Sequence, residues 1–210
     1  PVPRDCWGPC VMPWNGENWG GGRVAMPTPS GTTDLYAFEL DGADTTYVAS
    51  GEVEGTIADR WAMDAVGSSL RVAVGPSSET GNFNSVLTLR EQGAELVEAG
   101  RVDKLGVNEQ IKSVRWFDEL AIVVTFRQTD PLYAVDLTDP ADPELIGELK
   151  IPGFSEYLHP LGSQRMIGMG QDASLAGMIR GAQAALFDVS DLTAPRQLDV
   201  VRYAKGSHAG

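Results

Sequence analysis

Four aspartates in two similar turns are the clearest candidates for chemistry in this sequence. Asp136 and Asp139 lie in DLTDPADP, and Asp188 and Asp191 lie in DVSDLTAP. Short acidic side chains in such turns accept hydrogen bonds from the backbone that follows, and the prolines preset the turn. Several carboxylates on one turn also suit Ca²⁺, although the spacing and glycine of an EF-hand loop are missing. We predict structural turns, with calcium as the alternative role of the same four side chains.

Arg127, Asp130 and His159 form a second candidate group. Asp130 precedes a proline at a corner between two expected strands, Arg127 follows an aliphatic run, and His159 lies in YLHP. One hypothesis is that they converge at one blade edge or at the mouth of a channel, where they would bind a ligand. The structural alternative is an Arg127–Asp130 pair that fixes the corner and a His159 that caps a turn.

The two cysteines, Cys6 and Cys10, lie close together in CWGPC. A disulfide between them would close a small loop if the backbone bends enough, and it would indicate an oxidising compartment. A thioredoxin-type redox motif has two residues between its cysteines, and here there are three. A copper site with Met12 lacks a nearby histidine. Cys6–Cys10 is therefore a candidate disulfide.

Other motifs give little support for catalysis. Gly168–Ala173 resembles a dinucleotide fingerprint followed by Asp188, but Asp136 occupies the same kind of strand end with no glycine loop before it. The sequence contains no G-x-S-x-G, HExxH or P-loop motif. Enzyme activity is therefore without positive support, and no catalytic residue is predicted. The net charge of −13 argues against nucleic acid as a partner.

A sequence motif that recurs about every fifty residues predicts the structural elements that position these side chains. LYAFEL begins at Leu35, and related phrases follow as SVLTL, LYAVDL and AALFDV. Aligned on Glu39, Thr88, Asp136 and Asp188, the units are 49, 48 and 52 residues apart. Each unit consists of short β-branched or alternating runs bounded by Gly, Asp or Ser, which is typical of strands. This combination predicts an all-β fold, a β-propeller.

The repeat divides the chain into two parts. Residues 1–31 are rich in Pro, Gly and Trp and predict a connection or insertion, and residues 32–210 contain the blades. About 3.5 four-stranded blades are expected, from units near 34–75, 84–127, 132–171 and 183–210. Such a partial ring leaves open edges, which proteins normally avoid. Because the chain also starts at Pro1, we expect a piece of a larger propeller, completed by the remainder of the same precursor or by a second copy.

Two further expectations concern apolar residues. No apolar run approaches the roughly 20 residues that span a bilayer, so no membrane span is predicted in this chain. Four aromatic residues fall inside expected strands and predict core between blades rather than platforms for sugar rings. These are Trp61, Trp116, Phe126 and Phe154.

The stretch from Thr125 to Pro160, beginning TFRQTDPLYAVDLTDP, resembles secreted bacterial and archaeal proteins with a C-terminal β-propeller domain. The segment ALFDVSDLTAP, from Ala185 to Pro195, is similar to a repeat of the same family and to the LVIVD class of surface repeats. The resemblance implies an exported, extracellular or cell-surface propeller, and it carries over no catalytic residue. We expect a non-catalytic binding or scaffold module for a protein or glycan partner. The alternative is a secreted hydrolase or lyase whose site lies in the propeller channel or in the remainder of the precursor.

Overall fold

The computed structural model describes residues 31–77, 81–126, 130–151, 153–174 and 178–208. Almost all regular structure in these ranges is β-strand, and the strands fall where the sequence predicts them. The bounds are β1 (Thr32–Asp41), β2 (Asp44–Glu54), η1 (a 3-10 helix, Arg60–Ala62), β3 (Met63–Val66), β4 (Ser69–Val74), β5 (Asn84–Gln92), β6 (Glu95–Leu105), β7 (Gln110–Trp116), β8 (Leu120–Phe126), β9 (Asp130–Asp136), β10 (Glu144–Ile151), β11 (Phe154–Leu161), β12 (Arg165–Ala173), β13 (Ile179–Asp188) and β14 (Arg196–Arg202).

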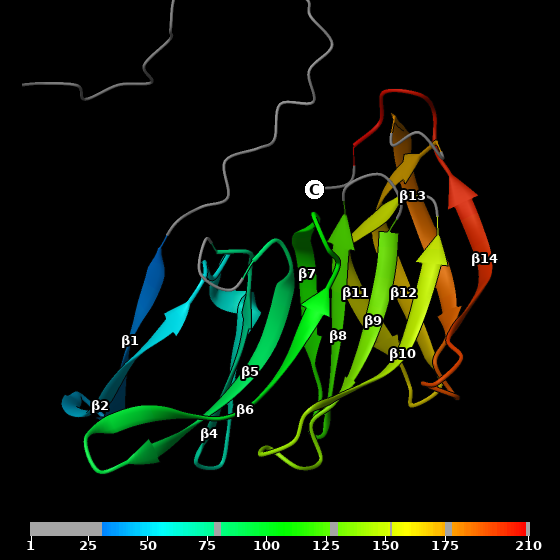
Figure 1. Ribbon diagram of the computed structural model, residues 1–210. Helices are drawn as coiled ribbons and strands as arrows, with labels where there is room; N and C mark the ends of the chain where they lie inside the picture. Colours follow the sequence, from blue (N-terminus) through cyan, green and yellow to red (C-terminus); the bar gives the residue numbers. More distant parts are fainter. Residues whose placement is uncertain (1–30, 78–80, 127–129, 152, 175–177, 209–210) are drawn as a thin grey trace, which may run out of the picture.

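The strands form antiparallel meanders that stand side by side along the chain (Figure 1). Strands β3–β6, β7–β10 and β11–β14 each make a four-stranded unit, and β1 and β2 make a hairpin before them. A single parallel pair, Ser50 with Glu95, joins the hairpin to β6 and extends that sheet to six strands. Three four-stranded units and one hairpin confirm the predicted all-β architecture of about three and a half blades.

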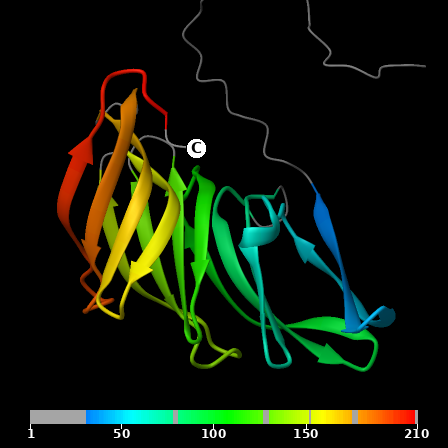
Figure 2. The same cartoon turned by 180° about the vertical axis from the view of Figure 1, so that it is seen from behind.

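The first strands of neighbouring units converge. Strand β7 contacts both η1 and β11, while β6 and β10 meet on the opposite side. Figure 2 shows the same units from behind, spreading like a fan. We call β3, β7 and β11 the inner strands, and β2, β6, β10 and β14 the outer strands.

The blades are offset by two strands from the sequence units. The unit near 34–75, for example, covers the β1–β2 hairpin and the first half of the next sheet. Each passage from an outer strand to the next inner strand contains a glycine with positive φ: Gly55 (105°), Gly106 (56°) and Gly153 (92°). Glycine adopts this conformation without the steric penalty of other residues. These three glycines, rather than the LYAVDL phrases, mark the blade boundaries.

The core lies between the blades. One cluster packs Leu35 and Val53 of the hairpin against β4 and β5. Two further clusters fill the spaces on either side of the β7–β10 sheet. In β8, Ala121 and Val123 belong to one of these clusters, and Ile122 and Val124 belong to the other. Because alternate side chains of a strand point to opposite faces, a strand buried on both sides must be apolar throughout, as AIVV is.

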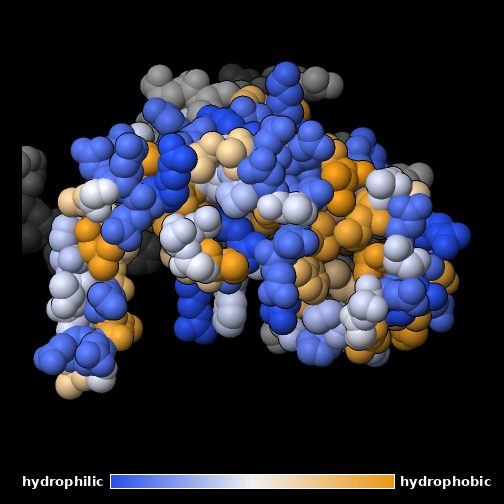
Figure 3. Space-filling model, turned by 90° about the horizontal axis from the view of Figure 1, so that it is seen from below, coloured by the Kyte–Doolittle hydropathy of each residue, from blue (hydrophilic) through white to orange (hydrophobic). Residues whose placement is uncertain are grey.

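Both ends of the fan present apolar side chains to solvent. On the hairpin, Tyr36, Phe38 and Leu40 are exposed at alternate positions of β1. At the other end, Leu198 and Val201 of β14 are exposed. Seen from below, the molecule is arched, and hydrophobic surface is visible on both arms (Figure 3). Exposed apolar patches of this kind are typical of surfaces that contact another protein surface.

One sequence expectation fails at the first inner strand. Trp61 was expected in the core between blades, but 60% of its surface is exposed. The 3-10 turn η1 replaces the start of the expected strand, so Ala62 enters the core in its place. Trp116, Phe126 and Phe154 pack in or against the clusters, as predicted.

Candidate ligand-binding site on the inner strands

A pocket of about 260 Å³ opens where η1, β7 and β11 meet, near the start of the inner strands. Its lining mixes charged, aromatic and aliphatic side chains, which is the usual character of a small-ligand site. The lining residues are Ala58, Asp59, Trp61, Ala62, Ile111, Lys112, Ser113, Val114, Arg115, Glu156, Tyr157 and Leu158.

Three of these side chains occupy equivalent positions in successive blades. Counting back five residues from the hairpin positions Val66, Phe117 and Leu161 gives Trp61, Lys112 and Glu156. We call these three residues the inner triplet. Because the inner strands converge, the inner triplet lines a single pocket although its members are far apart in sequence.

The backbone is irregular at all three positions. Trp61 lies in η1, and the pairing of β7 with β8 skips Lys112 between Ile111 and Ser113. The pairing of β11 with β12 skips Glu156 between Ser155 and Tyr157 in the same way. A β-bulge re-aims the extra side chain, and bulges are frequent beside functional sites. The irregularity at each position explains how these side chains reach the pocket instead of the core.

Trp61 is held from several sides while its ring remains accessible. Its backbone N–H donates to Asp59 Oδ1 at 2.7 Å, and its carbonyl accepts from Trp116 Nε1 at 2.9 Å. The Arg60 guanidinium lies 4.6 Å from the centroid of the indole ring. A cation at this distance is attracted to the face of the ring. The position of Trp61 is therefore fixed by polar contacts rather than by burial.

Other polar groups in and beside the pocket make contacts with neighbouring side chains and backbone groups. Ser113 Oγ donates to the carbonyl of Ser155 at 2.8 Å and ties β7 to β11. Tyr157 and His159 stack with their ring centroids 6.2 Å apart, and the Tyr157 hydroxyl lies 3.2 Å from His159 Nδ1. The Lys112 ammonium lies 5.7 Å from the Phe154 ring.

The predicted cluster of Arg127, Asp130 and His159 is only partly placed. Arg127 and the side chain of Asp130 lie outside the described residues. Their corner follows Phe126, whose ring lies 4.4 Å from that of Phe154 at the start of β11. His159 is five residues further along β11, about 16 Å at the usual rise of a strand. His159 thus lies on an inner strand next to the pocket, and the cluster itself stays a prediction.

The aspartate turns have the hydrogen bonds expected of structural turns. Asp136, Asp188 and Asp191 each accept from the backbone N–H and the hydroxyl of the residue two positions later. Asp139 accepts from the N–H of Ala141 at 2.8 Å. These bonds hold the pKa of the Asp136, Asp188 and Asp191 carboxyls below the usual range.

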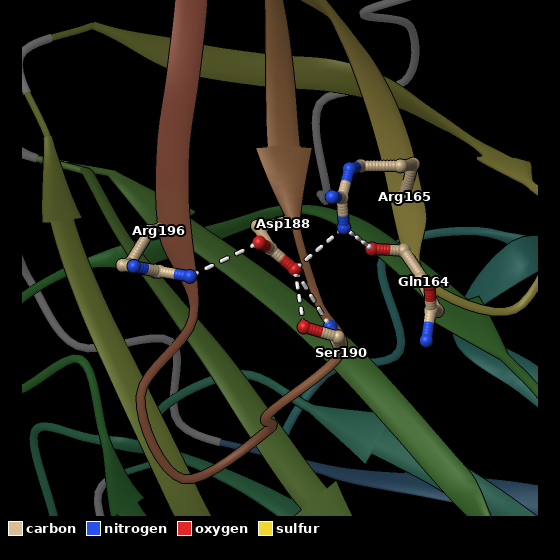
Figure 4. Close-up of polar contacts among 5 residues, drawn as sticks. All are labelled: Gln164, Arg165, Asp188, Ser190 and Arg196. Carbon is tan, nitrogen blue, oxygen red and sulfur yellow. Dashed lines mark hydrogen bonds and ion pairs between the residues drawn. The ribbon is translucent and has the colours of Figure 1, made fainter.

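Asp188 also connects three strands (Figure 4). Arg165 lies 2.7 Å from Oδ1, and Arg196 lies 3.1 Å from Oδ2. Two guanidinium groups therefore occupy the surroundings that a calcium ion at Asp188 would need. In the described part of the chain no group of three or more His, Cys, Asp and Glu side chains is arranged to hold a metal ion. Calcium stays a prediction, as does the Cys6–Cys10 disulfide, which lies outside the described residues.

Sequence reasoning missed most of the pocket. Lys112, Arg115, Glu156 and Tyr157 were not singled out, because strand periodicity does not reveal a bulge. The boundary glycines contain the missing signal. Aligning the blades on Gly55 and Gly106 brings Trp61 and Lys112 into register, each six residues after its glycine, whereas Glu156 follows Gly153 by three residues.

Comparison with known proteins agrees with this architecture. A family model described as a beta propeller domain matches residues 21–209. An uncharacterized protein of Methanocaldococcus jannaschii is 36% identical over 156 residues, which cover 74% of this chain and 24% of that protein. An uncharacterized protein of Archaeoglobus fulgidus is 36% identical over 145 residues, covering 69% of this chain and 22% of that protein.

The chain thus spans about a quarter of the length of the curated relatives that it matches. Among the described residues, no helix has the length and apolar character needed to cross a membrane. With its meandering four-stranded blades and a family match over most of its length, the chain belongs to the beta propeller domain family.

Proposed function

We propose that this chain is part of an extracellular or cell-surface β-propeller that serves as a non-catalytic binding and scaffold module. The inner-strand pocket provides the binding site for a protein or glycan partner. The observation that supports this most strongly is the inner triplet, which brings Trp61, Lys112 and Glu156 from three blades into one pocket. An exported location follows from the sequence resemblance and is itself part of the proposal.

The polar contacts of the pocket favour binding over catalysis. The Ser113 hydroxyl donates to a backbone carbonyl, and Asp59 accepts the N–H of Trp61. Both groups are therefore engaged in holding the fold. The alternative of a secreted hydrolase or lyase rests on Tyr157 and His159, since a hydroxyl beside an imidazole is a potential acid–base pair.

Binding tests on pocket variants distinguish the two functions. We expect Lys112→Met and Glu156→Gln to weaken binding in a panel of glycans and peptides, while the exposed Lys205→Met leaves binding unchanged. Turnover of a glycoside or polysaccharide substrate that is lost in Tyr157→Phe would instead establish the enzyme. A panel without any response to the pocket variants would contradict both functions.

We also propose that further chain of the same precursor completes the first blade. Among the residues that the structure describes, the β1–β2 hairpin has no counterpart of the two inner strands found in each of the other blades. A groove of about 500 Å³ lies between β1 and the β3–β4 hairpin, where those strands would pack. The greater length of the relatives supports a source in the same polypeptide.

Native mass spectrometry of the protein from its source cells, with peptide sequencing, tests this completion. We expect the 210-residue chain to occur together with another stretch of the same precursor. A symmetric dimer of this chain alone would show that a second copy closes the ring instead. Surface proteolysis of intact cells tests the exported location, because an internal protein would be protected.

A further inference from the structure

We infer that the inner-strand pocket binds an uncharged saccharide, with one sugar ring stacked on the indole of Trp61. This inference rests on the proposed function and names the class of ligand for the same pocket. Three properties of the pocket carry it: the accessible indole, the balance of charge and the volume.

Trp61 is an exposed aromatic residue on the pocket lining. Arg60 lies against the ring at 4.6 Å, and 60% of the residue is nevertheless exposed. The backbone of Trp61 is held by hydrogen bonds to Asp59 and Trp116, so stacking of a ligand restricts only the rotation of the side chain. A pyranose presents a face of C–H groups to such a ring and keeps its hydroxyls at the edge. Tyr157 places a second exposed aromatic side chain on the pocket lining.

The charged side chains of the pocket cancel. Lys112 and Arg115 are positive, and Asp59 and Glu156 are negative, so the lining has no net formal charge. Lysine and arginine only donate hydrogen bonds, and an ionised carboxylate only accepts them. A ligand with hydroxyl groups satisfies both kinds of partner because each hydroxyl donates and accepts. An ion of either sign would be repelled by half of the lining charges.

The volume favours a compact ligand. At about 260 Å³ the pocket lies just below the roughly 300–1,000 Å³ typical of sites that enclose drug-sized molecules. One or two sugar rings match this space better than a folded segment of a partner protein. The bulges at Lys112 and Glu156 place opposite charges at equivalent positions of adjacent blades, so a sugar edge can reach both.

Titrations of the full chain with maltose, cellobiose and mannobiose, followed by saturation-transfer NMR, test the inference. We expect at least one disaccharide to bind, and Trp61→Ala to weaken its binding by about tenfold or more, as for other well-placed aromatic contacts. Trp61→Phe should retain part of the binding because a ring remains. The matched control is Tyr203→Ala, another exposed aromatic residue outside the pocket lining, which should bind as the wild type does.

A switch in charge preference separates ligand contact from a structural role. Glu156→Gln leaves the pocket lining with one excess positive charge and should shift preference from glucose towards glucuronic acid. Lys112→Met leaves one excess negative charge and should shift preference towards glucosamine, which is cationic. A variant that merely damaged the fold would weaken all three sugars equally, and circular dichroism would reveal the damage.

The outcomes also separate this inference from the proposed function. Disaccharide binding that is unaffected by Trp61→Ala, together with binding of a peptide such as Lys-Gly-Glu that depends on Lys112, would overturn the inference of a saccharide ligand. The proposed binding module would then still stand. If neither sugars nor peptides respond to substitutions in the pocket, both are overturned.

Discussion

The outer strands of this molecule carry the same residue at equivalent positions of successive blades, whereas the inner strands carry different residues at such positions. On the outer side, Gly100 of β6 and Gly147 of β10 each face the turn of the next blade. A Cβ atom on Gly100 would lie 2.6 Å from Pro143 Cδ, and one on Gly147 would lie 1.8 Å from the carbonyl oxygen of Leu192. On the inner side, the inner triplet occupies one position in each of three successive blades. Its members Trp61, Lys112 and Glu156 differ in both size and charge.

This difference teaches where the repeat is constrained. The aspartate turns dock on outer strands, and the contact leaves room only for glycine, so the same residue recurs in successive blades. The inner triplet faces open space in the pocket, so its residues can differ without disturbing the packing of the blades. We therefore expect stability to depend mainly on the outer contacts, and we propose that binding takes place at the inner ones.

The largest effect should come from closing an outer contact. Gly147→Ala places a methyl group against the Leu192 carbonyl, and we expect about 3 kcal/mol of lost stability, the upper range for overpacking. Urea unfolding followed by circular dichroism measures this loss. Gly31→Ala is the matched control, since a Cβ there meets no atom within 4 Å. If Gly147→Ala is as stable as Gly31→Ala, the turn at Leu192 can shift to accommodate a methyl group and the outer contact is not a tight constraint.

A buried arginine tests whether inter-blade contacts elsewhere are equally important. Arg71 is only 4% exposed, bonds to Asp64, and donates to the carbonyl of Asp118 in the next blade at 2.8 Å. Arg71→Met leaves Asp64 without this partner and should cost roughly 2–4 kcal/mol, somewhat less than for a fully buried pair because Asp64 is partly exposed. The exposed Arg90→Met should change the free energy of unfolding little. Equal losses in both variants would contradict the role of Arg71 between blades.

Acid should weaken the aspartate turns. The Ser190 hydroxyl and N–H hold the pKa of Asp188 below its ordinary value of 3.8, and Arg165 and Arg196 act in the same direction. A lowered folded-state pKa adds stability that is fully present above pH 3.8 and is lost as the pH falls through the folded-state pKa. Urea unfolding between about pH 5 and pH 2 should therefore show a smaller pH dependence for Asp188→Asn than for the wild type. Identical slopes would exclude this contribution.

The smallest effect on stability should come from the inner triplet. Glu156→Gln alters an exposed side chain that lines the pocket, and we expect a change within about 0.5 kcal/mol. Thermal unfolding measured beside Gly147→Ala gives the comparison directly. A loss of stability in Glu156→Gln as large as that in Gly147→Ala would contradict the distinction between inner and outer strands.

Several local features could be predicted from the sequence because neighbouring residues determine them. The aspartate turns depend on side chains that bond to the backbone two residues later, as Asp136 does with Thr138. The strands depend on β-branched runs such as AIVV in β8. Other features depend on distant residues. The exposure of Trp61 depends on a short 3-10 turn, and the position of Glu156 depends on a one-residue skip in pairing with β12.

The sequence by itself determined the strands, their period and the chemistry of their turns. Each of these is fixed by contacts within one unit, where a few adjacent residues set the backbone. The tertiary structure alone decided which strands share a sheet and which side chains meet at the centre. Blade boundaries fall at Gly55, Gly106 and Gly153 because the chain must cross there from an outer to an inner strand. The inner triplet comes together because three blades converge, an arrangement that depends on packing between residues far apart in the sequence.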